Sequence, residues 1–204
     1  MPSKKQIYEL VAMQLSGGVP QRASKFSDPR PVYAIMDTVR DKLVAEFLIP
    51  QIYNQRFVDS AYITTIQPVS VQLDTALNTY YSVMPVKLLE LPRDMQVYQI
   101  FPLQSVADEF VRISAHTAWL FKDSGANTLQ NNVGYYTDKS KAYYQGINPQ
   151  VTQVGMRLVV AGQSIQEDDF YIGNELMEAL IANTIKLMQP MATIPQDLSN
   201  NNNG

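Results

Sequence analysis

The sequence predicts an α+β fold, in which an antiparallel, strand-rich central domain is flanked by N-terminal helices and a C-terminal helix, with extended terminal arms. Apolar residues recur at helical spacing up to about residue 57, short β-branched and aromatic segments replace them after residue 60, and helical spacing returns near residue 173. The expected organisation is an N-terminal helix at 1–18, an extended connector at 19–31, an α+β body at 32–189 (helix 32–57, strands 60–162, helix 173–189) and a C-terminal tail at 190–204.

The first helix is predicted by a capping box and an amphipathic stripe. Ser3 is followed three residues later by Gln6, and the Gly17–Gly18 pair provides a stop. The apolar stripe behind the cap consists of Ile7, Leu10, Val11 and Leu15. A polar segment with two prolines follows, which predicts an extended connector between this helix and the body.

Two prolines mark the second helix. Pro31 suits its first turn, where backbone N–H groups have no helical partner. Pro50 is expected to kink or end the helix, with the pattern from Ile52 to Phe57 continuing it for another turn or two. Its apolar stripe consists of Val32, Ile35, Met36, Val39, Leu43, Phe47 and Leu48.

Short strands are expected through the middle of the chain because β-branched and aromatic residues cluster there. A hairpin is predicted where the pair Tyr135–Tyr136 and the pair Tyr143–Tyr144 flank Asp138-Lys139-Ser140. Residues 123–132 are expected to form a turn. The predicted strands are 61–66, 69–73, 80–84, 86–91, 96–101, 110–114, 117–121, 134–137, 142–145 and 154–160.

The last helix carries acidic residues in its first turns and Lys186 near its end, which matches the helix dipole. Pro190 is expected to end it. The run Asn200–Asn203 has little apolar surface to offset the entropy cost of ordering. Order in residues 190–204 therefore requires a surface built around them, and we expect an extended arm on a neighbouring subunit, anchored by Ile194 and Leu198.

Composition excludes several chemistries. The 204-residue chain has no cysteine and a single histidine, His116, so disulfides, thiolate nucleophiles and multi-histidine metal sites within one subunit are excluded. The net charge of −3 argues against a protein whose main function is to bind the phosphate backbone of nucleic acids. The sequence shows neither a signal peptide nor an apolar stretch long enough for a membrane span, so we expect a non-membrane protein.

No catalytic constellation emerges from the motifs. The only Gly-Gly pair follows a helix, unlike a phosphate-binding loop, and Gly162-Gln163-Ser164 lacks the closing glycine of a nucleophile elbow. Carboxylates cluster at Glu167-Asp168-Asp169 and at Asp108-Glu109, and such groups are ligands for divalent cations. Solvated acidic turns are the simpler interpretation of both clusters. We therefore expect no enzyme activity, no catalytic residues, no cofactor and no metal.

The terminal helices and the low-charge surface, with 18 Gln and 12 Asn, favour an assembly subunit. The connector is long enough for the first helix to extend away from the body of its own chain. We therefore expect the apolar stripe of this helix, Ile7, Leu10, Val11 and Leu15, to pack on another subunit or partner. Together with Ile194 and Leu198 these residues form the candidate interface.

A resemblance adds to this reading. The stretch Tyr80 to Pro92, continuing from Gln99 to Gln104, resembles a block in structural proteins of crAss-like and related tailed bacteriophages, and the order of helices and strands around it is similar. The resemblance implies a head–tail connector subunit, a ring or adaptor protein stacked below the portal. It implies dodecameric rings of the same chain, contacts with portal and neighbouring ring or tail proteins, a channel that passes genomic DNA without specific binding, and location in the virion after assembly in the bacterial host cytoplasm.

Two alternatives stay open. One is another virion subunit, from the tail or an auxiliary part of the capsid. The other, from a different class, is a small β-type hydrolase or carbohydrate-binding module. A cleft with convergent carboxylates would favour the hydrolase, whereas interaction surfaces on opposite sides of one subunit would favour the ring.

Overall fold

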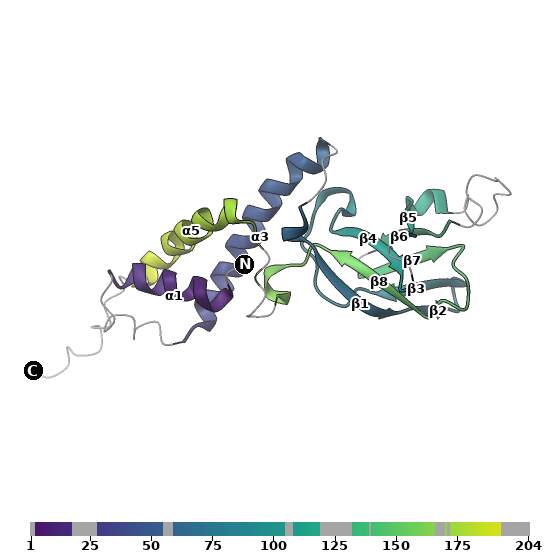
Figure 1. The fold of residues 1–204 in the computed structure, drawn as a ribbon, viewed down its shortest axis with the longest axis horizontal. Helices are drawn as coiled ribbons and strands as arrows, with labels where there is room; N and C mark the ends of the chain where they lie inside the picture. The colour runs from purple at the N-terminus through teal and green to yellow at the C-terminus, as the bar shows by residue number, and fades with distance from the viewer. Residues whose placement is uncertain are drawn as a thin grey trace, which may run out of the picture.

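The α+β prediction is confirmed by a computed structural model. It describes residues 3–17, 28–54, 59–104, 108–118, 132–138, 140–165, 170 and 172–192. Helices lie at one end of the molecule and strands at the other (Figure 1). The helices are α1 (Lys4–Leu15), α3 (Arg30–Tyr53) and α5 (Asn174–Ala192); the strands are β1 (Thr64–Ser70), β2 (Gln72–Asp74), β3 (Thr79–Val83), β4 (Val97–Pro102), β5 (Val111–Arg112), β6 (Gly134–Asp138), β7 (Lys141–Gln145) and β8 (Gln153–Leu158).

The predicted capping box of α1 is confirmed. The Ser3 hydroxyl accepts from the Gln6 backbone N–H at 3.2 Å, and the Gln6 side chain accepts from the Ser3 N–H at 2.9 Å. These two bonds satisfy donors that the first turn of a helix leaves unpaired. They fix where α1 begins, as the sequence predicts.

The prolines interrupt the helices less than expected. α3 runs through Pro50 to Tyr53, and α5 runs through Pro190 to Ala192, so the prediction that Pro190 ends the last helix is wrong. Both prolines lie in the final turn, where little helix follows. The missing N–H and the clash with the preceding turn therefore disturb only the helix end.

The strands form two sheets that share a corner. One sheet has the order β1-β8-β4 and is antiparallel; the other has the order β2-β3-β7-β6-β5, with β5 and β6 parallel. The chain passes directly from β1 into β2, and so from one sheet to the other. On the opposite side, the Phe110 N–H donates to the Ile100 carbonyl of β4 at 2.8 Å, just before β5 begins. The inner faces of both sheets contribute to one core together with α1, α3 and α5.

Several strand predictions are confirmed and others are corrected. The tyrosine hairpin forms, with Asp138 opposite Lys141 and Tyr136 opposite Tyr143. Residues 86–91 are not a regular strand: they run beside the end of β8 with a single bridge, Leu88 to Val160. Residues 60–62 and 115–117 form 3₁₀ turns, and most of the expected strand at 117–121 lies outside the described residues. The expected strand at 69–73 is divided between β1 and β2, and the strand at 110–114 shortens to β5. Most of the expected turn at 123–132 lies outside the described residues.

A buried polar cluster joins the helices to the strands. The Arg40 side chain of α3 is fully buried and donates to the Val160 carbonyl at 2.7 Å and to Asp41 at 2.9 Å. The same Asp41 oxygen accepts from the Gly162 N–H at 2.8 Å. A Cβ at Gly162 would lie 2.8 Å from the Asp37 Cα, so only glycine permits this approach of helix and loop.

Candidate interaction surfaces

The structure corrects the first half of the interface prediction. Ile7 and Val11 are fully buried in the chain's own core, and Leu15 packs against that core. Ile7 and Val11 are therefore not available to a partner in this fold. The expectation remains a prediction for Leu15, which is partly buried, and for Leu10, which is 46% exposed.

Leu10 has an exposed neighbour that the sequence analysis missed. Met13 is 60% exposed and lies three residues further along α1. Positions i and i+3 share one helix face, so Leu10 and Met13 form an apolar pair on the outer side of α1. The signal was present in the spacing, but the buried stripe beside it was the stronger pattern. Glu9 is exposed next to this pair.

Electrostatics helps to hold the inner side of α1 in place. The Lys4 ammonium lies 2.6 Å from an Asp37 carboxylate oxygen of α3, and both side chains are largely removed from solvent. The same ammonium lies 5.6 Å from the ring centre of Tyr33 and 5.5 Å from that of Phe170. Burial raises the pKa of Asp37 above its ordinary value, and the nearby Lys4 opposes this rise.

A second apolar surface lies between α3 and α5. The groove encloses about 240 Å³ and is lined by Val39, Lys42, Leu43, Glu46, Asn183, Lys186 and Leu187. Leu187 is 53% exposed at its edge. Lys42 lies 3.9 Å from Glu46, whereas no ion pair with Lys186 occurs among the described residues. The groove therefore combines an apolar floor with a net positive edge.

The outer face of the five-stranded sheet carries a row of three tyrosines. Tyr81, Tyr143 and Tyr136 lie side by side on β3, β7 and β6. The Tyr136 and Tyr143 rings stack with their centres 5.3 Å apart, and the centre of the Tyr81 ring lies 5.9 Å from that of Tyr143. The Lys141 ammonium lies 4.3 Å from the Tyr81 ring centre. Tyr143 thus has a ring on each side, so the Tyr143 ring itself offers little open face for a sugar or a base.

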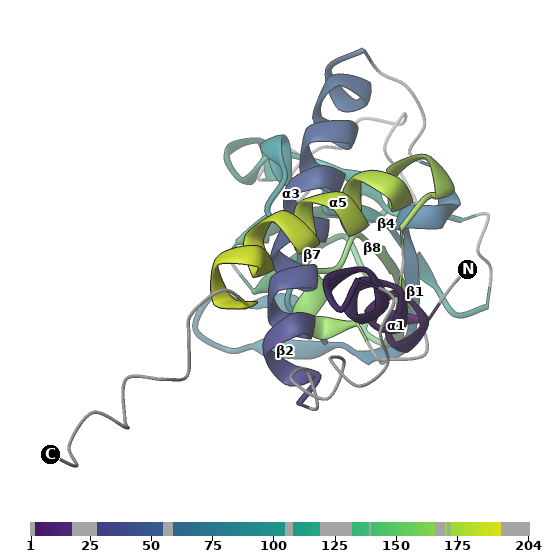
Figure 2. The ribbon, with the colours of Figure 1, turned by 90° about the vertical axis from the view of Figure 1, so that its left-hand side faces the viewer.

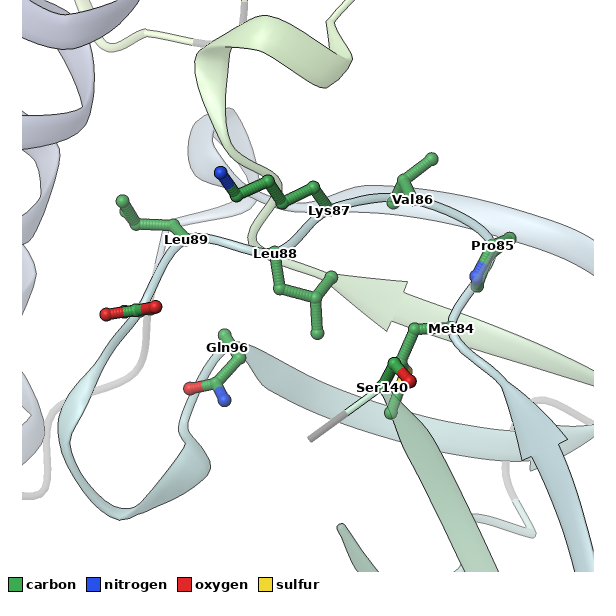
Figure 3. A pocket seen from close by; sticks show the side chains of 9 residues that line it. Met84, Pro85, Val86, Lys87, Leu88, Leu89, Gln96 and Ser140 are labelled. Atoms are coloured by element: carbon green, nitrogen blue, oxygen red, sulfur yellow. The ribbon is translucent and has the colours of Figure 1, made fainter. Parts of the chain in front are cut away.

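A wide groove follows residues 84–90. It has a volume of about 680 Å³ and is lined by Met84, Pro85, Val86, Lys87, Leu88, Leu89, Glu90, Gln96 and Ser140. Figure 3 shows the Leu88 side chain directed between Gln96 and Met84. Glu90 is the one carboxylate of this lining. The groove thus lacks the pair of carboxylates that glycoside hydrolysis requires.

The remaining carboxylates do not assemble into a metal site within the described residues. Asp108 and Glu109 line a cavity of about 530 Å³ together with Asn132 and Asn148, but no group of three acidic or histidine side chains gathers anywhere in the described ranges. His116 is exposed. Glu167-Asp168-Asp169, Ile194 and Leu198 lie outside the described residues.

No protein-family model matches this chain, and no curated protein matches its sequence. Among the described residues, no helix combines the length and hydrophobicity that a bilayer span requires. The surfaces themselves are therefore the basis for a functional proposal.

Proposed function

We propose that this chain is a virion structural protein of a tailed bacteriophage, a subunit of a head–tail connector ring stacked below the portal. In this proposal twelve copies form the ring, portal and tail proteins contact its two sides, and genomic DNA passes through the channel without specific binding. Assembly takes place in the bacterial host cytoplasm. The protein acts by binding other proteins, without catalysis or a cofactor.

The observation that carries the proposal is the division of exposed apolar side chains between the two ends of the molecule. One group belongs to the helical end: Leu10, Met13 and Leu187. Tyr53, at the end of α3, instead lies beside the strand body, where the Arg93 guanidinium is 5.2 Å from its ring centre. The other belongs to the strand body: Leu73, Leu77, Val83, Leu103 and Val111. Figure 1 shows that these two parts occupy opposite ends of the long axis.

This distribution supports a subunit that contacts protein on more than one side. Single exposed apolar residues are ordinary on a soluble protein, but Leu73 and Leu77 lie on one short hairpin, and Leu10 and Met13 on one helix face. The net charge of −3 also suits a channel that passes DNA, because such a channel must not bind phosphates.

Measurement of the mass of the purified protein, alone and with the portal protein of the same phage, tests the proposal. We expect ring-sized particles, with twelve copies of the 23.0 kDa chain, that bind portal. Particles that bind tail or capsid proteins but not portal would indicate a different virion subunit. A protein that stays monomeric with all of these partners would contradict the proposal.

A further inference from the structure

We propose that the outer face of α1 in one copy binds the groove between α3 and α5 of the next copy. This inference rests on the proposed ring and names the contact that builds it. The α1 face consists of Glu9, Leu10 and Met13. The groove is the one lined by Val39, Leu43 and Leu187, with Lys42, Glu46 and Lys186 at its edge.

The two surfaces match in shape and hydrophobicity. A groove of about 240 Å³ between two helices is smaller than the usual 300–1,000 Å³ of a small-molecule site, but it suits the side chains of a third helix. Leu10 and Met13 project as an i, i+3 pair, the spacing with which an amphipathic helix enters a groove. Both are exposed on the isolated chain, as is Leu187 at the groove.

The charges of the two surfaces are complementary. Glu9 lies beside the apolar pair on α1 and has no ion pair with any described residue. In the groove, Lys42 has Glu46 nearby at 3.9 Å, whereas Lys186 has no ion pair within the part of the chain that the structure describes. A Glu9–Lys186 pair would fix the direction in which α1 lies in the groove.

The positions of the surfaces favour a second copy as the occupant. In Figure 2, α1 lies to the right of α3, whereas the C-terminal half of α5, which lines the groove, extends to its left. The α1 of the same chain packs its opposite side into its own core, so its outer face is exposed and open to contact by another molecule. A contact between two different surfaces of identical subunits is heterologous, and such contacts generate rings when the rotation closes.

Two variants break the contact from opposite sides. Leu10→Lys with Met13→Lys places ammonium groups against Lys42 and Lys186, and Leu187→Glu places a carboxylate against Glu9. All three positions are exposed, so the folded subunit is retained; matching thermal unfolding curves verify this. Each variant is expected to weaken self-association about 10- to 100-fold, the equivalent of one buried leucine. Gln153→Lys is the matched control, since Gln153 is exposed at the start of β8 and belongs to neither group of exposed apolar side chains, and its self-association should equal that of the wild type.

The decisive measurement is native mass spectrometry of the two variants mixed. Each variant keeps one intact surface, so the mixture should form a 1:1 heterodimer that neither variant forms alone. Restored assembly of Glu9→Lys combined with Lys186→Glu would further support the pair. If wild type assembles but the Leu10→Lys/Met13→Lys variant assembles equally well, or if the mixed variants fail to pair, the α1–groove contact is wrong while the ring proposal stands. If wild type assembles only on portal, the same comparisons are made there; if it assembles with nothing, the proposed function itself fails.

Discussion

The approach of α3 to the loop after β8 provides a direct test of how the two layers are joined. Replacement of Gly162 by alanine puts a Cβ 2.8 Å from the Cα and 2.9 Å from the Cβ of Asp37. Both atoms belong to the rigid part of a helix and cannot rotate away. α3 must therefore retreat by about 0.6 Å before an ordinary van der Waals contact of about 3.4 Å is reached.

This retreat also stretches two hydrogen bonds on the same helix. The Arg40–Val160 bond of 2.7 Å and the Asp41–Gly162 bond of 2.8 Å would both lengthen to about 3.3–3.4 Å, beyond the usual range. Overpacking costs about 1–3 kcal/mol, and weakening two bonds that involve charged groups adds about 1 kcal/mol. We expect Gly162→Ala to lower the free energy of unfolding by about 2–4 kcal/mol and the Tm by about 5–15 °C.

Urea unfolding followed by tryptophan fluorescence and circular dichroism measures this loss. The control is Gly17→Ala, which adds a methyl group where no atom lies within 4 Å and costs only the strain of φ +63°, about 1 kcal/mol. Amide exchange at residue 162 should also accelerate in Gly162→Ala. If Gly162→Ala is no less stable than the Gly17→Ala control, the contact between α3 and the loop does not hold the layers together.

Two further changes test the buried polar groups. Lys4→Met removes the cation that opposes the effect of burial on Asp37, so the pKa of Asp37 should rise further; carboxyl NMR titration measures it, and an unchanged pKa would refute the reasoning. A raised folded-state pKa means that Asp37 contributes stability at low pH that is lost as the pH rises through that pKa, and this loss should be larger in the variant. Tyr62→Phe removes the 2.5 Å bond from the Tyr62 hydroxyl to Glu175 and should cost about 1.5–3 kcal/mol at pH 7. Burial and Glu175 raise the pKa of Tyr62, so the wild type should lose stability above about pH 10. The difference in unfolding free energy between the wild type and Tyr62→Phe should therefore narrow above this pH. A difference that stays constant in urea unfolding across this pH range would contradict the assignment.

Local patterns in the sequence predict local structure well. The capping box locates the start of α1, and the paired tyrosines locate the β6–β7 hairpin, because both signals depend on residues only a few positions apart. The apolar segment at 86–91 misleads because its residues satisfy their backbone groups against the irregular end of β8, with bonds such as the Leu89 N–H to the Val159 carbonyl at 3.0 Å. The β-propensity of these residues predicts a strand, but the backbone segment with which they pair determines the geometry that they adopt.

Long-range contacts were beyond the reach of such patterns. Arg40 is a charged residue that the expected apolar stripe of its helix leaves out, yet its side chain is fully buried and donates to the carbonyl of Val160, 120 residues away. The stripe of α1 shows that one face is buried but not against what, and the structure assigns Ile7 and Val11 to the chain's own core. The groove between α3 and α5 combines residues that are more than a hundred positions apart, so no sequence window contains it.

The placement of α1 and α5 in the same layer has a practical consequence for labelling. The first described residue, Ser3, caps α1, and the last, Ala192, ends α5, so a probe attached at either residue lies at the helical end (Figure 1). Such a probe would report on that end alone. The four exposed residues of the β2–β3 turn, Thr75 to Asn78, offer an insertion point at the strand end, where a short epitope disturbs no buried backbone. Gold labels introduced at the two positions would give the polarity of the subunit in electron micrographs of an assembled particle.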